Sequence, residues 1–467
     1  MSALRRPLAP RRATRYSTPL PAPRPVLLVL SALAIAAASF AAALAPSSSA
    51  PLGPAATAPP AVALPADVPA EGRPLAEVDR ALAAWSANLA AEPADFISAV
   101  NLAELYLARQ RISGDAADVA RAAEAAERAL AIDPELAPAR LVRAQAAHAA
   151  HDFAGAEADA LTVLEAAPDA PEALAVLGDA RLELGAYDLA ATTYARLAQL
   201  ADGPSVDARL ARLAALTGRL ADARALAAAA TEAARAAATS RTALSWYLGL
   251  EASLAFQAGD LVAAEAGWRA AVAAWDGSAP AHAGLGRTLV ASGDLEAARA
   301  SLERAVAIRP LPEALVPLAD IQERLGDAEA ARTTRATFVA VAELGGLDRQ
   351  LSRHLADRGE DPERAVGLAR ADLRVRGDVY AHDTLAWALL TAGRPEAADR
   401  EMELARAAGT EDAVLDYHAG MIAAALGRDD EARRLLSAAL ERNPEFDPAQ
   451  ADRARAALAA LAGAVRP

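Results

Sequence analysis

The sequence contains no cysteine and no lysine among its 467 residues. Without cysteine, the chain has no disulfide, no zinc thiolate site and no thiol nucleophile. Without lysine, it has neither the phosphate-binding lysine of a P-loop nor a lysine Schiff base. Aromatic residues make up only 4% of the chain, so few large side chains are present to fill thick hydrophobic layers. These absences favour closely packed helices with small residues at their contacts.

Acidic residues are missing from the start of the chain and abundant in the rest. Residues 1–66 carry six arginines and no acid, which leaves 41 arginines against 61 acidic residues in the remainder. Nucleic-acid binding depends on basic side chains that release condensed counterions, so an acidic body is a poor partner for phosphate backbones. We therefore expect no nucleic-acid partner.

An apolar run of twenty residues, 26–45, separates an arginine-rich arm, 1–25, from a tract rich in proline, alanine and serine, 46–74. Twenty helical residues span about 30 Å, the thickness of the hydrocarbon core of a bilayer. The arginines before the run predict that the arm stays in the cytoplasm and that the rest is exported. We predict a single-pass transmembrane signal-anchor, a disordered linker and an extracytoplasmic domain.

Cleavage of the apolar run as a signal peptide is the alternative. Small-x-small sites end at Ala45, Ala50 and Ala58, but a proline follows each of them, and signal peptidases handle such sites badly. The run is also longer than the apolar region of most cleavable signals. We favour a retained anchor, while cleavage would give a secreted or periplasmic protein.

Beyond the linker, a glycine recurs at intervals close to 34 residues. Glycine is favoured where a helix ends in the left-handed conformation, in which a side chain would clash. A small residue precedes each turn by seven positions and an alanine follows it, as two closely packed antiparallel helices require. Gly114 marks a further unit with a longer turn. The column reads His151, Gly185, Gly218, Gly259, Gly293, Gly326, Gly359, Gly393 and Gly427.

The stretch VLGDARLELGAYDLAATTYARL, from Val176 to Leu197, resembles a tetratricopeptide repeat, whose 34-residue unit has a Leu-Gly pair and a small residue after the turn. The resemblance covers about Pro93 to Ala462. It implies an all-α fold, an α-solenoid of about ten helix-turn-helix repeats that form a right-handed superhelix. We place the array at 93–447, between a capping helix at 75–92 and a C-terminal capping helix with its tail at 448–467, because open solenoid ends expose apolar faces.

Signals for catalysis are weak. Neither a Gly-x-Ser-x-Gly nor a His-Glu-x-x-His pattern occurs. His148 and His151 have a spacing that can place two ligands on one helical face, but no third ligand is identifiable. We therefore predict no catalytic residues, no cofactor and no metal site, and a protein that is not an enzyme.

The first helices of such arrays line a concave surface, and residues there that exceed packing needs are candidate ligand contacts. Aromatic side chains beside arginines suit a groove that captures apolar side chains and carboxylates of a protein or peptide partner. Packing between repeats, for the aromatics, and solvated charge, for the arginines, are the alternatives. The predicted contacts are Arg349, Arg353, Tyr380, Asp383, Trp387, Tyr417 and Met421.

Together these features predict a membrane-anchored scaffold that binds a partner protein or peptide in its concave groove. The alternative is a secreted or periplasmic assembly factor for an envelope complex or transporter, from which the N-terminal segment has been cleaved. In both cases the function is binding, and the partner's identity is not encoded in any motif of the sequence.

Overall fold

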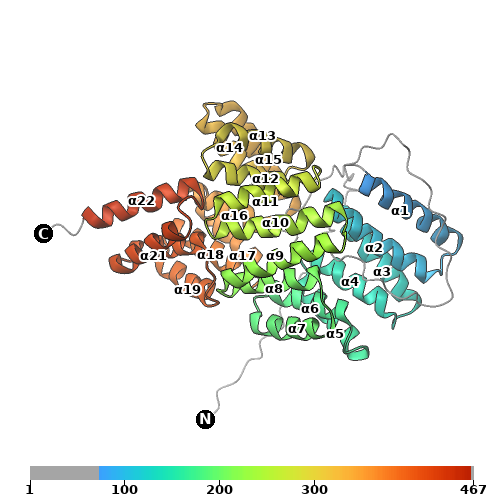
Figure 1. Ribbon diagram of the computed structural model, residues 1–467. Helices are drawn as coiled ribbons and strands as arrows, with labels where there is room; N and C mark the ends of the chain where they lie inside the picture. Colours follow the sequence, from blue (N-terminus) through green and yellow to red (C-terminus); the bar gives the residue numbers. More distant parts are fainter. Residues whose placement is uncertain (1–72, 464–467) are drawn as a thin grey trace, which may run out of the picture. The chain divides into compact units, whose positions relative to one another are not determined.

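The computed structural model describes residues 73–463, and all secondary structure found there is helical (Figure 1). The predicted all-α solenoid is confirmed. The helices are α1 (Arg73–Ala91), α2 (Phe96–Ser113), α3 (Ala116–Ile132), α4 (Ala137–Ala149), α5 (Phe153–Ala166), α6 (Pro171–Glu183), α7 (Tyr187–Leu200), α8 (Pro204–Leu216), α9 (Leu220–Ala236), α10 (Arg241–Gln257), α11 (Leu261–Ala274), α12 (Ala279–Ala291), α13 (Leu295–Ile308), α14 (Pro312–Arg324), α15 (Ala328–Gly345), α16 (Asp348–Arg358), α17 (Pro362–Leu373), α18 (Val379–Thr391), α19 (Pro395–Arg406), α20 (Ala413–Ala425), α21 (Asp429–Arg442) and α22 (Pro448–Gly463).

Helices α2 to α21 pair in chain order as ten hairpins, with α1 and α22 at the two ends. The turn inside each hairpin has its closing residue in the left-handed region, with φ between 64° and 85°. The predicted turn column is thereby confirmed, including His151, whose φ is 64°. Histidine is among the side chains that tolerate this region best, which is why it stands in for glycine at one turn.

The two predicted columns of small residues meet inside the hairpins. Ala298, after the turn between α12 and α13, is fully buried, as are its equivalents in the other hairpins. Where glycine occupies the column before the turn, a large side chain faces it. Gly178 faces the ring of Tyr194, and Gly286 faces Leu302, so closely that a Cβ on either glycine would overlap the partner. Small residues therefore set the distance between paired helices.

Helix lengths follow the irregular spacing of the turns. Helices α9 and α10 have 17 residues each, whereas α8 and α12 have 13, as predicted from the 41-residue interval after Gly218. Pro74, expected at the end of the linker, lies instead in the first turn of α1. Proline is tolerated there because the first backbone N–H groups of a helix have no intrahelical partner.

Within residues 73–463, no helix is both long and apolar enough to cross a bilayer. The predicted arm 1–25, the predicted transmembrane segment 26–45 and the linker up to residue 72 lie outside the described residues. The anchor and its sidedness therefore stay predictions.

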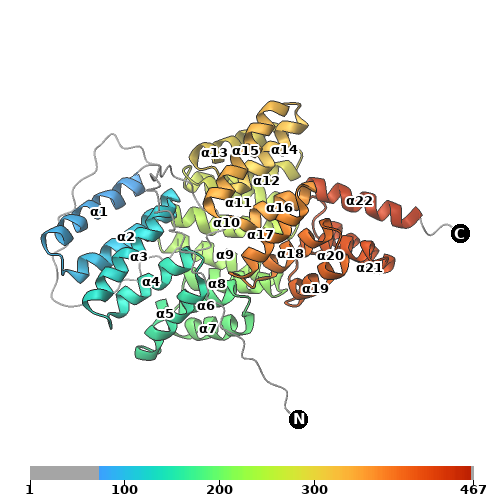
Figure 2. The same ribbon diagram turned by 180° about the vertical axis from the view of Figure 1, so that it is seen from behind.

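Segments far apart in the sequence lie side by side, because one turn of the superhelix touches the next. Helices α6 to α8 lie beside α17 and α18 in both views (Figure 1 and Figure 2). We call this line of contact the seam. Its hydrogen bonds run from the Gly377 amide to the Glu183 carbonyl (3.1 Å), the Val379 amide to the Tyr187 hydroxyl (2.9 Å), the Thr410 hydroxyl to the Leu216 carbonyl (2.5 Å), the Gln257 side-chain amide to the Glu411 carbonyl (2.8 Å) and the Asn443 side-chain amide to the Phe256 carbonyl (2.8 Å).

The two backbone segments at the seam come into direct contact because glycines occupy the positions of contact. A Cβ on Gly185 would collide with the carbonyl oxygen of Gly377, and one on Gly218 would collide with that of Gly409. Val379 adds an apolar contact, since it is buried in the cluster formed by α6, α7 and α8. The seam therefore closes the interior of the array along one side.

Candidate functional site: an interior cavity

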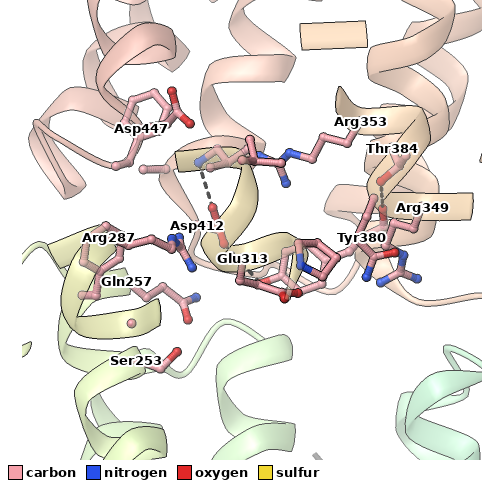
Figure 3. A pocket seen from close by; sticks show the side chains of 18 of the residues that line it. Ser253, Gln257, Arg287, Glu313, Arg349, Arg353, Tyr380, Thr384, Asp412 and Asp447 are labelled. Atoms are coloured by element: carbon pink, nitrogen blue, oxygen red, sulfur yellow. Dashed lines mark hydrogen bonds between the residues drawn. The ribbon is translucent and has the colours of Figure 1, made fainter. Parts of the chain in front are cut away.

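A cavity of about 590 Å³ lies inside the array, on the side of the first helices of the hairpins (Figure 3). Helices α6, α8, α10, α12, α14, α16, α18 and α20 contribute to its wall, together with the segment after α21. Many lining residues stand about 2, 6, 9 or 13 positions before a turn glycine, a spacing that follows one face of a helix. The volume falls within the usual range of ligand pockets.

The end of the cavity near α6 and α18 is lined by close ion pairs. Arg349 donates from Nε to Asp372 at 2.7 Å and from Nη2 to Asp378 at 2.8 Å. Burial opposes the charged form of this guanidinium, yet Asp378 and Asp372 hold the pKa of Arg349 above its ordinary value. Burial alone would raise the pKa of Glu183, but its close pairing with Arg212 lowers that pKa to about 2. The charges at this end satisfy one another.

The end near α12 and α14 carries charges without close partners (Figure 3). The Arg287 guanidinium lies over the Phe256 ring, 5.3 Å from its centroid, and within residues 73–463 it makes no ion pair. The pKa of Arg287 is lowered because desolvation outweighs the attraction of Glu313. The Arg287 side chain is exposed, so solvent reaches it within the cavity. Arg353 has one loose partner, Asp357, with 3.9 Å between Nε and Oδ2.

Three carboxyl groups face these two arginines. Burial raises the pKa of Glu313, and this side chain forms no ion pair with another described residue. Asp412 accepts hydrogen bonds from the Tyr380 hydroxyl at 3.1 Å and the Val414 amide at 2.8 Å, and Asp447 accepts one from the Gln450 amide. Both aspartates lie within electrostatic reach of Arg287 and Arg353.

The two kinds of group at this end determine which ligands fit. The guanidinium groups of Arg287 and Arg353 offer N–H donors, and the carboxyl groups keep lone pairs free. A ligand that carries both acceptors and donors satisfies this end better than an apolar one, because unpaired buried polar groups are costly. The peptide backbone with polar side chains is such a ligand.

The predicted contact residues fall into three groups. Trp387 is 4% exposed, donates from Nε1 to Asp357 at 2.8 Å and stacks on the His418 ring at 4.1 Å. Asp383 is hydrogen-bonded to Nδ1 of His418 at 2.7 Å. These side chains connect α16, α18 and α20. They therefore take part in packing between repeats, which is the alternative to contact with a partner in the groove. Of the predicted set, Arg349, Arg353 and Tyr380 line the cavity, Asp383, Trp387 and Tyr417 are buried behind its wall, and Met421 packs at the margin of a core cluster.

Several charged residues of the cavity wall were not predicted from the sequence. Arg287, Glu313, Asp412 and Asp447 line the cavity, and none of them belongs to the predicted set. One signal was present, because an arginine directly follows the small column in three first helices. These are Arg212, Arg287 and Arg353, and all three line the cavity.

A comparison with protein families supports the resemblance for one hairpin. The profile of the tetratricopeptide repeat matches residues 279–310, which contain α12 and α13. No curated protein sequence matches the chain. The family model therefore covers one central hairpin.

Solved structures match the chain only distantly. Human IFIT1, in a dimer with PPP-AAAA, is 14% identical, with a TM-score of 0.44 over 79% of this chain and 88% of its own. Yeast Tom70 is 13% identical, with a TM-score of 0.36 over 83% of this chain and 93% of its own. A tetratricopeptide repeat protein from Parabacteroides merdae is 17% identical, with a TM-score of 0.39 over 50% and 87%. At these identities and TM-scores, the matches say nothing of this chain's ligand or function.

Proposed function

We propose that this protein is a non-catalytic scaffold that binds a short polar segment of a partner protein inside its array. The observation that carries the proposal is the cavity end at which Arg287, Arg353 and Glu313 lack close partners. Arg287 is exposed and Arg353 and Glu313 are half-buried, so all three can exchange water for charge-assisted hydrogen bonds to a ligand with complementary groups. Solenoids commonly present such a concave interior to their ligands.

The size of the cavity limits what enters it. A volume of about 590 Å³ holds a few residues of an extended chain and excludes a folded domain. The partner therefore contributes a short segment, and its own folded parts stay outside. Charges of both signs in the wall favour a polar segment.

The proposal places the array outside the cytoplasm, tethered to a membrane by residues 26–45. Support comes from the length of this apolar run and from the arginines that precede it. A secreted or periplasmic assembly factor for an envelope complex or transporter is the alternative. The intact mass of the mature protein separates the two, because a chain that begins after Ala45 or Ala50 has lost the anchor.

The proposal assigns no reaction to the chain. Asp383 and His418 pair at 2.7 Å in an arrangement that hydrolases also use, but each side chain is 1% exposed and out of reach of a substrate. Their contacts fix α18 against α20. Catalytic activity of the purified chain alone would contradict the proposal.

Two arginine variants test the cavity as the binding site. Arg287→Ala removes a guanidinium from the cavity, whereas Arg299→Ala removes one from the outer surface of α13, where it pairs with Glu303 at 2.8 Å. The tagged full chain captures its partner from detergent-solubilised membranes, and the affinity of each variant for that purified partner is then measured. We expect Arg287→Ala to weaken binding at least tenfold and Arg299→Ala to leave it unchanged. Equal affinity of the two variants would move the site out of the cavity.

A further inference from the structure

The seam is part of the cavity wall. Side chains or carbonyls of seam residues face the cavity on both sides of the line of contact. The residues that both form seam hydrogen bonds and line the cavity are Glu183, Leu216, Phe256, Gln257 and Asn443. Separation at the seam would therefore uncover the cavity, including the end at which Arg287 lacks a close partner.

The contacts across the seam are sparse compared with those inside a hairpin. Five hydrogen bonds hold it, together with the ion pair of Arg376 with Glu183 (3.6 Å) and the Arg376 guanidinium over the Phe153 ring. Val379, Tyr380 and Ala408 add apolar contacts, and the seam glycines contribute no side chains. Each hairpin instead buries a column of alanines together with leucines or aromatic rings. Water replaces broken hydrogen bonds at an opened seam, so the net loss per bond is small. Regions with few buried apolar contacts open before the rest of a structure unfolds.

The seam also restricts how a protein ligand enters from the side. A free chain terminus can pass along the axis of the superhelix. A segment inside a folded partner is flanked by bulk on both sides, so it enters only if the wall opens sideways. The seam offers a sideways opening that breaks few contacts.

We propose that the seam is a gate. It opens as a unit while the hairpins stay folded, admits the partner's segment to the cavity and closes over it. The identity of the ligand rests on the proposed function above, whereas the opening is a property of the chain by itself.

A single introduced cysteine reports on the gate, because the chain has none of its own. Ser253→Cys places a thiol in the cavity wall. Its reaction is followed with N-ethylmaleimide and with a maleimide that carries a bulky polyethylene glycol. Thr410→Val, in the same chain, removes the hydroxyl that donates to the Leu216 carbonyl across the seam. Thr337→Val is the matched control, since that hydroxyl donates within α15 to the Thr333 carbonyl at 2.9 Å.

We expect the bulky maleimide to react slowly with the Ser253→Cys chain and several-fold to about tenfold faster when Thr410→Val is added, as loss of one hydrogen bond implies. Thr337→Val should leave that rate unchanged, and N-ethylmaleimide should react quickly throughout. If Thr410→Val does not change labelling by the bulky reagent, ligands reach the cavity by another route and the gate is refuted. The gate is also refuted if both reagents react equally fast with the Ser253→Cys chain that lacks Thr410→Val.

Hydrogen exchange of the otherwise unmodified chain gives a second measurement. The amides of Gly377 and Val379 donate across the seam, so they should exchange faster than the amides inside the hairpins and faster again with Thr410→Val. If these amides exchange as slowly as the hairpin amides, the seam does not open on its own. Neither measurement uses a partner, so a failure of the gate is distinguishable from a failure of the proposed binding function.

Discussion

The turn glycines in the two halves of the array occupy the same column of the sequence but have different surroundings. Gly185 and Gly218, in the first half, would each collide with a backbone carbonyl if they carried a Cβ. Gly326 and Gly393, in the second half, have no atom within 4 Å of that position. Their φ values are alike, between 69° and 85°. The left-handed backbone conformation therefore explains all four glycines. Close approach of another backbone segment is a second constraint only on the two in the first half.

In the second half, the hairpin turns at Gly326 and Gly393 are free of the seam, and a buried aromatic cluster holds helices of this half together. Trp387, Tyr417, His418 and Phe446 pack with ring centroids 4.1 to 5.7 Å apart. Such pairs add to the stabilisation that area burial provides. The two halves thus depend on different contacts, which separate substitutions can test.

The largest effect is expected at Trp387. Replacement by alanine should lower the free energy of unfolding by about 3–5 kcal/mol, because it leaves a cavity among the aromatic rings and removes the hydrogen bond to Asp357. Leu404→Ala is the control, since Leu404 is 54% exposed. Urea unfolding of both variants measures the difference. A stable Trp387→Ala chain with weakened partner binding would show that this residue contacts the partner instead.

A smaller effect is expected from the same substitution at turns of the two halves. Asparagine adopts the left-handed conformation, so Gly393→Asn should cost less than about 1 kcal/mol. Gly218→Asn should cost about 1–3 kcal/mol more, because its Cβ overlaps the Gly409 carbonyl and forces the seam apart. Urea midpoints of the two variants provide the comparison. Equal midpoints would mean that the seam is not closed in solution.

The hairpins were predictable from the sequence because they depend on local rules. The left-handed turn, the small columns and the helical spacing all act within about 34 residues, as the turn between α12 and α13 shows with Gly293 and Ala298. The seam depends instead on the pitch of the superhelix, which sums small rotations over several repeats. No pattern in the sequence therefore relates Gly218 to Gly409.

The candidate site was predictable only in part, for a similar reason. Arg353 and Trp387 stand at the same position, six residues before a turn glycine, yet Arg353 faces the cavity and Trp387 is buried. The segment after α21 makes the difference, because Phe446 packs against Tyr417 and the Gln450 side chain donates to Asp357 at 2.8 Å. A position within the repeat does not show which repeats the C-terminal segment covers.

The smallest expected effect concerns two histidines, one in each half. Burial, reinforced by Arg376 at His151 and by Arg358 at His354, lowers the pKa of each histidine to about 4. The unfolded chain binds protons near the ordinary pKa of about 6.5, so between pH 6.5 and pH 4 it takes up more protons than the folded chain. Stability is therefore complete above about pH 6.5 and falls as the pH drops towards 4.

Between pH 7 and pH 5, the His354→Leu chain should lose about 1 kcal/mol less stability than the wild type. His151→Asn, which keeps the left-handed turn accessible, should reduce the loss by a similar amount. Urea midpoints measured across this pH range for the wild type and both variants give the comparison. If only His354→Leu reduces the pH dependence, His151 is protonated freely in the folded chain. The first half would then be open to water beside the seam, at the place where Arg376 lies over the Phe153 ring.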